Sequence, residues 1–95
     1  MFDNILINHY RLNNEQLIGL ENHISENGIL FINGFGHKHV VNSKIREEDL
    51  IQPTDFAGIQ RYFELIKHIE DQDDRGYFVT YIFRKNKVNI SLNKQ

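Results

Sequence analysis

Two histidines, His37 and His39, form the pattern in this sequence that is best suited to metal chemistry. On a β-strand, a His-x-His spacing places both imidazoles on one face, where they can share an ion. A catalytic site needs a third ligand, and His9, His23 or His68 would supply one only through the fold. No other metal-binding motif accompanies the pair. We therefore expect two solvent-facing histidines with no metal and no cofactor, and keep a metal site and a pH-sensitive contact surface as alternatives.

Covalent and acid–base catalysis find no supporting pattern. The chain has no cysteine, and its serines lie in no nucleophile-elbow motif. The acidic runs Glu47–Asp49 and Asp71–Asp74 lie in polar segments, where nothing indicates the burial that catalytic carboxylates need. Asn33–Gly36 is rich in glycine but lacks the Lys-Ser/Thr pair of a phosphate-binding loop. The sequence predicts no catalytic residue and a protein that is not an enzyme.

Length and charge narrow the class of protein. A chain of 95 residues predicts a single domain spanning 1–95. A net charge of −2 argues against nucleic acid and against an anionic membrane surface as the main partner. No apolar run approaches the ~20 residues that span a bilayer. The absence of cysteine favours a cytoplasmic location, and the composition indicates a bacterial or phage source.

Hydrophobic periodicity predicts the elements of the first half of the chain. Residues 2–12 are ambiguous between strand and helix, and their isoleucines favour a short strand. We expect a helix over about 14–27, because Asn13 can cap it, Gln16 completes a capping box and Gly28 can stop it. A buried strand (29–32), a turn at Asn33–Gly36 and a returning strand (37–41) are expected to follow.

The second half has the clearest pattern. Thr54 is a suitable N-cap for a long amphipathic helix that runs to Ile69. Its apolar stripe consists of Phe56, Ile59, Phe63, Ile66 and Ile69. The chain is expected to turn at Asp73–Gly76 and to form a hairpin of strands 77–84 and 87–92. In that hairpin Val79, Tyr81 and Phe83 face inward.

These elements, in the order β-α-β-β-α-β-β, predict an α+β fold. Its two layers are a mainly antiparallel sheet of four to five strands and two helices packed on one face of the sheet.

The stretch Tyr77–Arg84, with the basic turn that follows it, resembles the terminal hairpin of ribonuclease toxins of the type II toxin–antitoxin class. This resemblance implies RNA cleavage with Arg84, Lys85 and Lys87 and with His37 or His39, but the acidic net charge counts against phosphate binding. The passage from the long helix into Gly76–Thr80 resembles, in outline, small bacteriocin-immunity proteins.

The outer face of the predicted sheet is the best candidate for function. Phe78 and Ile82 lie there among polar neighbours that include Arg84 and Lys87, which is typical of a protein-binding patch. Phe35, at the tip of the predicted turn, is a suitable binding anchor.

We therefore expect a small non-enzymatic protein that binds, and inhibits or regulates, another protein, as an inhibitor, immunity protein or adaptor. A homodimer through the outer face or an edge strand is consistent with this pattern. The alternatives are an RNA-cleaving toxin and a histidine-based binder of a metal or small molecule.

Overall fold

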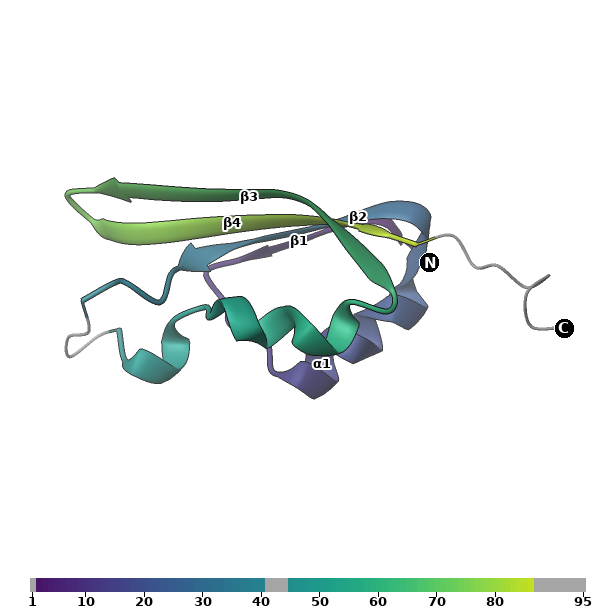
Figure 1. Cartoon of the computed structure of the whole chain (residues 1–95), viewed down its shortest axis with the longest axis horizontal. Helices are drawn as coiled ribbons and strands as arrows, with labels where there is room; N and C mark the ends of the chain where they lie inside the picture. Colours follow the sequence, from purple (N-terminus) through teal and green to yellow (C-terminus); the bar gives the residue numbers. More distant parts are fainter. Residues whose placement is uncertain (1, 41–44, 87–95) are drawn as a thin grey trace, which may run out of the picture.

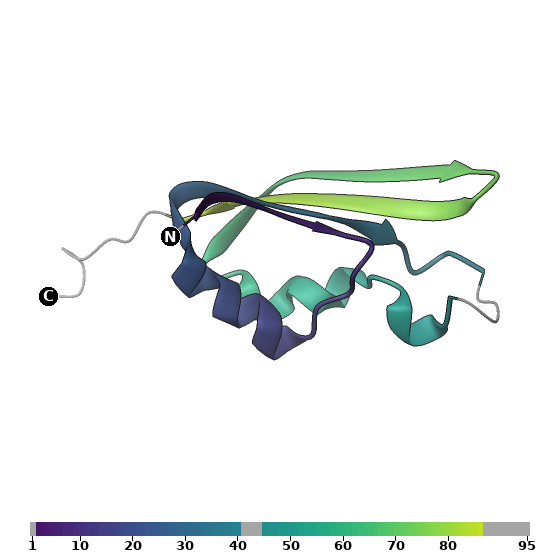
Figure 2. The same ribbon diagram turned by 180° about the vertical axis from the view of Figure 1, so that it is seen from behind.

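A computed structural model describes residues 2–40 and 45–86 of the chain. One sheet holds its strands in the order β1-β2-β4-β3, and the helical segments cover one face of it (Figures 1 and 2). The strands are β1 (Phe2–Asn8), β2 (Ile24–Phe35), β3 (Phe63–Asp73) and β4 (Gly76–Lys85). β1 runs parallel to β2, and the other two pairings are antiparallel. The predicted α+β class, a mainly antiparallel sheet with two helices on one face, is confirmed.

The first helix begins as predicted but ends early. In α1 (Asn14–Leu20), Gln16 N–H donates to Asn13 Oδ1 at 2.8 Å, and Asn13 N–H donates to Gln16 Oε1 at 2.9 Å. A 3₁₀ turn, η1 (Glu21–His23), follows, and β2 starts at the fully buried Ile24. Gly28 therefore does not stop a helix. It lies inside β2, where a Cβ atom would collide with Ile24 and with the backbone of Asp3.

The turn predicted at Asn33–Gly36 is wrong, because β2 runs straight through to Phe35. Asn33 pairs with Asn8 of β1 on one side and with Thr80 of β4 on the other. Its side-chain amide also donates to Thr80 Oγ1 at 2.7 Å. Pairing on both sides thus overrides the local Asn-Gly turn preference. The returning strand predicted over 37–41 is absent from residues 37–40, and residue 41 lies outside the described part of the chain.

The long helix predicted from Thr54 to Ile69 is also wrong. A 3₁₀ helix, η3 (Pro53–Ile59), is capped by Gln52 and Asp55 rather than by Thr54, and β3 begins at Phe63. Phe56, Ile59 and Phe63 are buried as predicted, but Ile66 and Ile69 are 48% and 40% exposed. The stripe therefore divides between a short helix and an edge strand. No helix within residues 2–40 and 45–86 is long and apolar enough to cross a membrane.

β4 is the central strand of the antiparallel part, and its two faces are as predicted. Val79, Tyr81 and Phe83 point into the core, whereas Phe78 and Ile82 lie half-buried on the outer face. The turn at Asp73–Gly76 connects β3 to β4. The strand predicted over 87–92 lies outside the described residues, and β4 instead pairs with β2 and β3. The remaining core side chains are Leu17, Ile24, Leu30, Ile32, Ile51, Phe56, Ile59, Phe63 and Tyr77.

Candidate functional site at the carboxyl ends of β1 and β2

Because β1 and β2 are parallel and connected through α1, their carboxyl ends lie side by side at one end of the sheet (Figure 1). His9 follows β1 directly, and its backbone N–H donates to the carbonyl oxygen of Asn33 at 2.8 Å. Its φ angle is 58°, in the left-handed region that non-glycine residues seldom adopt. Such strain persists where surrounding contacts impose it, and it is frequent at ligand sites. His9 is therefore the first residue of the candidate site.

The ring of His9 belongs to an aromatic cluster, which consists of His9, Phe35, His39 and Phe78 and is here called the carboxyl-end cluster. Phe35 stacks on Phe78 with ring centroids 4.9 Å apart, and His39 lies 4.4 Å from Phe35 on a tilted plane. His9 contacts both phenylalanines, with centroids at 5.8 and 6.3 Å. The cluster brings together residues from β2, β4 and the segments that follow β1 and β2.

His39 is fixed by the start of β4. Its Nδ1 accepts a hydrogen bond from the backbone N–H of Tyr77 at 3.1 Å, so Nδ1 is the acceptor nitrogen of the ring. The ring also lies against Gly76, where any Cβ atom would collide with it. Nε2 of His39 is buried and has no hydrogen-bond partner among the described residues.

Beneath the cluster, on the helical side of the sheet, lies a pocket of about 330 Å³. Ile51 lines this pocket and is fixed to the end of β2, because its backbone N–H donates to Phe35 O at 2.8 Å. The lining residues are His9, Tyr10, Arg11, Gly34, Phe35, Ile45, Glu48, Asp49 and Ile51. A second pocket of about 320 Å³ lies on the outer face. His9 lines this pocket too, together with Phe78. His9 thus separates two hollows, each in the size range of small-molecule sites.

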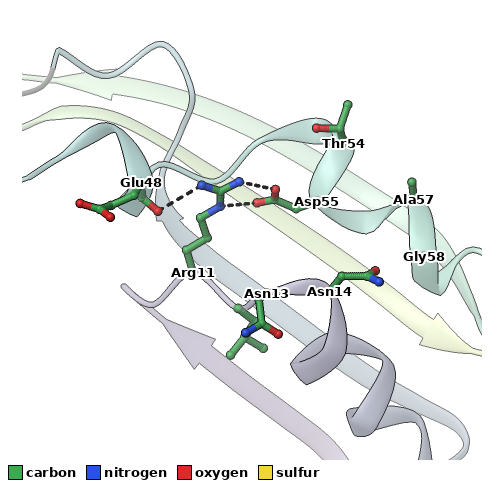
Figure 3. A pocket seen from close by; sticks show the side chains of 9 residues that line it. Arg11, Asn13, Asn14, Glu48, Thr54, Asp55, Ala57 and Gly58 are labelled. Carbon is green, nitrogen blue, oxygen red and sulfur yellow. Dashed lines mark hydrogen bonds and ion pairs between the residues drawn. The ribbon is translucent and has the colours of Figure 1, made fainter.

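Arg11 lines this pocket and also a neighbouring one, where Figure 3 shows its contacts with Asp55 and Glu48. Its guanidinium donates to both carboxylate oxygens of Asp55, at 2.8 and 2.6 Å, and to the backbone oxygen of Glu48 at 3.1 Å. The hydrogen bond to Asp55 raises the pKa of Arg11. Asp55 also accepts from Gln52 N–H at 3.0 Å. Arg11 therefore connects the end of β1 to η3 and to the loop that holds Glu48.

The surroundings of the pocket are acidic. Among the described residues that line it, Arg11 is the cation and Glu48 and Asp49 are the carboxylates, so one negative charge is in excess. Arg46, outside the lining, pairs with Glu48 at 3.0 Å. The lining also includes the aromatic residues His9, Tyr10 and Phe35. Acidic groups next to aromatic faces favour a cation over an anion.

A polar group on β3 borders the same end of the sheet. Tyr77 donates its hydroxyl hydrogen to Glu70, and this bond is the main reason that the pKa of Glu70 is lowered. Burial and the same carboxylate raise the pKa of Tyr77 to about 12. Glu70 also lies 3.6 Å from Lys38 and 3.4 Å from His68. These contacts hold the segment after β2 against β3.

The structure brings some of the predicted binding residues together. Phe35 is not at a turn tip but ends β2, where it stacks on Phe78, and Ile82 lies further along the same outer face. Arg84 is exposed and forms an ion pair with Glu64 at 2.7 Å. Lys87 lies outside the described residues. Protein binding by these residues stays a prediction.

The other predicted sites are not assembled. Lys85 is only 7% exposed and donates to Ile24 O at 2.7 Å, so it does not belong to a surface basic cluster. His37 and His39 lie outside any strand and against different neighbours, Tyr77 and Phe35. Within residues 2–40 and 45–86, no group of three or more His, Asp or Glu side chains could hold a metal ion.

Sequence reasoning considered His9 only as a third metal ligand and missed its place in the site. Its importance comes from a positive φ angle and from contacts with Phe35 and Phe78, which lie far away in the sequence. The usable signal was the position of His9 at the end of a strand.

Neither the protein-family models nor the curated proteins contain a match to this chain. One solved structure is similar: the N-methyltransferase NodS from Bradyrhizobium japonicum WM9, with 11% sequence identity and a TM-score of 0.65. The match covers 92% of this chain and 52% of NodS, so the chain spans about half the length of that protein. At this identity the likeness shows the fold alone.

This likeness corrects the expectation of a non-enzymatic inhibitor, immunity protein or adaptor. The sheet and its helices, which were expected to serve only as a scaffold for a protein-binding patch, form an architecture that is shared with half of an enzyme. Its β1–α1–β2 unit also brings together the ends of two parallel strands, beside His9 and Phe35.

Proposed function

We propose that this chain is the ligand-binding part of an enzyme and that it binds a small molecule carrying a protonated amine and an apolar group. The binding site is the carboxyl-end cluster together with the pocket beneath it. His9 carries the proposal, because its strained backbone holds a ring between two hollows at the end of a parallel strand pair.

The position of the site supports ligand binding. Where parallel strands are joined by a crossover helix, ligands bind beyond the carboxyl ends of those strands. β1 and β2 are such a pair within the mainly antiparallel sheet, and the 3₁₀ turn Glu47–Asp49 covers their ends from the helical side. Phe35 and Phe78, which were expected to contact a protein partner, are proposed to contact the small molecule.

The charge of the site supports an amine. The pocket combines the aromatic rings of His9, Tyr10 and Phe35 with the carboxylates of Glu48 and Asp49. A cation over an aromatic face gains about 0.5–2 kcal/mol. An amine as the ligand class also agrees with the name of NodS, because N-methyl transfer needs a nitrogen acceptor, which must lose its proton before it reacts. The cytoplasmic location expected from the sequence remains a prediction.

The test is a titration of the ¹⁵N-labelled protein with benzylamine, benzyl alcohol and benzoate, which share a ring and differ in charge. Benzylamine is expected to shift the backbone resonances of His9, Gly34 and Phe35 and to bind about tenfold more tightly than benzyl alcohol. Benzoate is expected to bind most weakly. His9→Ala should weaken benzylamine binding about tenfold.

His23→Ala is the matched control, because His23 is an exposed histidine that precedes β2, at the opposite end of the sheet. It should leave benzylamine binding unchanged. Equal affinity for benzylamine and benzoate would show that the acidic loop does not select the ligand. Resonance shifts confined to residues away from the ends of β1 and β2 would place the site elsewhere and refute the proposal.

A further inference from the structure

The two edges of the sheet differ sharply in charge. β3, at one edge, carries the ionisable side chains that discourage pairing with another strand. They are Glu64, Lys67, His68, Glu70, Asp71 and Asp73. The opposite edge, over Asn4–Asn8 of β1, has no charged side chain. Phe2 and Leu6 of β1 and the nearby Tyr10 are nevertheless 61%, 65% and 56% exposed. β1 is therefore the edge that lacks protection against pairing.

Within residues 2–40 and 45–86, no strand pairs with the outer edge of β1, and the direction of its backbone groups can be assigned. His9 N–H donates to Asn33 of β2, so the preceding carbonyl, that of Asn8, points away from β2. Peptide groups alternate direction along a strand. The N–H and C=O groups of Asn4, Leu6 and Asn8 therefore face the open edge. A partner strand would pair with these three residues.

The sequence of this edge is a palindrome. Residues 4–8 are Asn-Ile-Leu-Ile-Asn, symmetric about Leu6. When two copies of a strand pair antiparallel across a two-fold axis at Leu6, Leu6 faces the partner's Leu6. Ile5 then faces the partner's Ile7, and Asn4 faces the partner's Asn8. Such an interface uses the same patch on both subunits, and every facing pair here matches in chemistry.

The backbone agrees with this register. In antiparallel pairing, residues whose N–H and C=O both point at the partner form the hydrogen-bonded pairs. Leu6 lies on the axis and is one of the three outward-facing residues, and Asn4 and Asn8 are the other two. A register centred on Ile5 or Ile7 would put a non-hydrogen-bonded pair on the axis, which antiparallel pairing also allows. The hydrogen-bond direction therefore admits the register at Leu6, and the palindrome selects it.

The regular ladder is limited to residues 4–8. β1 is irregular between Phe2 and Asn4 where it pairs with β2, and the positive φ angle of His9 ends the extended backbone after Asn8.

We propose that this chain forms a symmetric homodimer in which β1 pairs antiparallel with β1 of a second copy, with the two-fold axis at Leu6. The dimer joins the two sheets into one continuous sheet with the β3 edges outside. This inference goes beyond the proposed amine site and does not depend on it.

The first test compares the dimer dissociation constants of variants by sedimentation equilibrium, with the wild type expected at twice the chain mass of 11.3 kDa. Leu6→Lys and Leu6→Glu each put like charges on the axis, and each should raise the constant about tenfold or more. Leu65→Lys is the matched control, because Leu65 is an aliphatic residue, 49% exposed, on the other edge. It should leave the constant unchanged.

The second test mixes the two variants. Because residue 6 faces residue 6 of the partner, Leu6→Lys and Leu6→Glu should restore a dimer with each other although each fails alone. Leu6→Cys, in a chain that has no other cysteine, should form an intermolecular disulfide on mild oxidation, since Cα atoms of such a pair lie ~5.5 Å apart. Circular dichroism of each variant checks that the fold is kept.

A wild-type protein that stays monomeric at high concentration would overturn the proposal and leave the edge to a strand of another protein. Failure of the two charged variants to combine would place the contact elsewhere on the surface. A wild-type protein that dimerises but does not bind benzylamine would refute the proposed function and leave the dimer proposal standing. The two proposals can therefore fail separately.

Discussion

The ion pair between Arg11 and Asp55 should be worth far more than the similar pair between Asp73 and Arg75. Asp55 accepts two bonds from Arg11 and one from Gln52, and its side chain is only 11% exposed. Asp55→Asn removes the charge and leaves one oxygen to accept. Charge-assisted hydrogen bonds contribute about 1.5–3 kcal/mol each, and partial exposure of Arg11 reduces this. We expect Asp55→Asn to lower the free energy of unfolding by about 2 kcal/mol.

Asp73→Asn supplies the comparison, because Asp73 also accepts side-chain hydrogen bonds from an arginine, three in number, but in an exposed turn and from a residue two positions away. Solvent screens such a pair, so its loss should lie within the error of the measurement. Urea unfolding measures the stability of both variants. The same measurement on Arg11→Met, alone and combined with Asp55→Asn, gives the coupling energy between Arg11 and Asp55. Equal effects of Asp55→Asn and Asp73→Asn would show that the end of β1 is not held by Arg11.

Two further predictions concern the start of β4. Gly76 has φ 141° and lies against His39, so Gly76→Ala should lower stability by about 1–3 kcal/mol and lower the melting temperature. The pKa of Tyr77 is about 12 in the folded chain against about 10 when unfolded, so its contribution is complete below pH ~10 and is lost as the pH rises toward 12. Tyr77→Phe should flatten that alkaline loss in urea unfolding measured across this range, and an unchanged alkaline profile would contradict the assignment.

The fold was predictable where local pattern and tertiary contacts agree. The alternation over Val79, Tyr81 and Phe83 predicted the inner face of β4, and the charged turn before Gly76 marked the beginning of that strand. The capping box of Asn13 likewise gave the start of α1. In each case neighbouring residues alone decide the conformation.

Prediction failed where distant partners decide. Phe63, Ile66 and Ile69 fit a helical period, but this segment extends beside β4, where Phe63 is buried and Ile66 and Ile69 are partly exposed on an edge strand. Asn33-Gly34 has a strong turn preference that pairing with β1 and β4 overrides. The role of His9 could not be predicted for the same reason, since its backbone angle and its ring contacts exist only after the sheet has formed.

The reactivity of the buried amine of Lys85 can report local opening of the fold. Its Nζ bonds to Ile24 O and Glu21 O, where η1 meets the first residue of β2. An amine that is enclosed in this way cannot reach an acylating reagent, because Lys85 is only 7% exposed. Lys85 is therefore acylated only while η1 lifts from the end of β4. The ratio of its acylation rate to that of the exposed Lys38 measures how often this end of the fold opens in the native state.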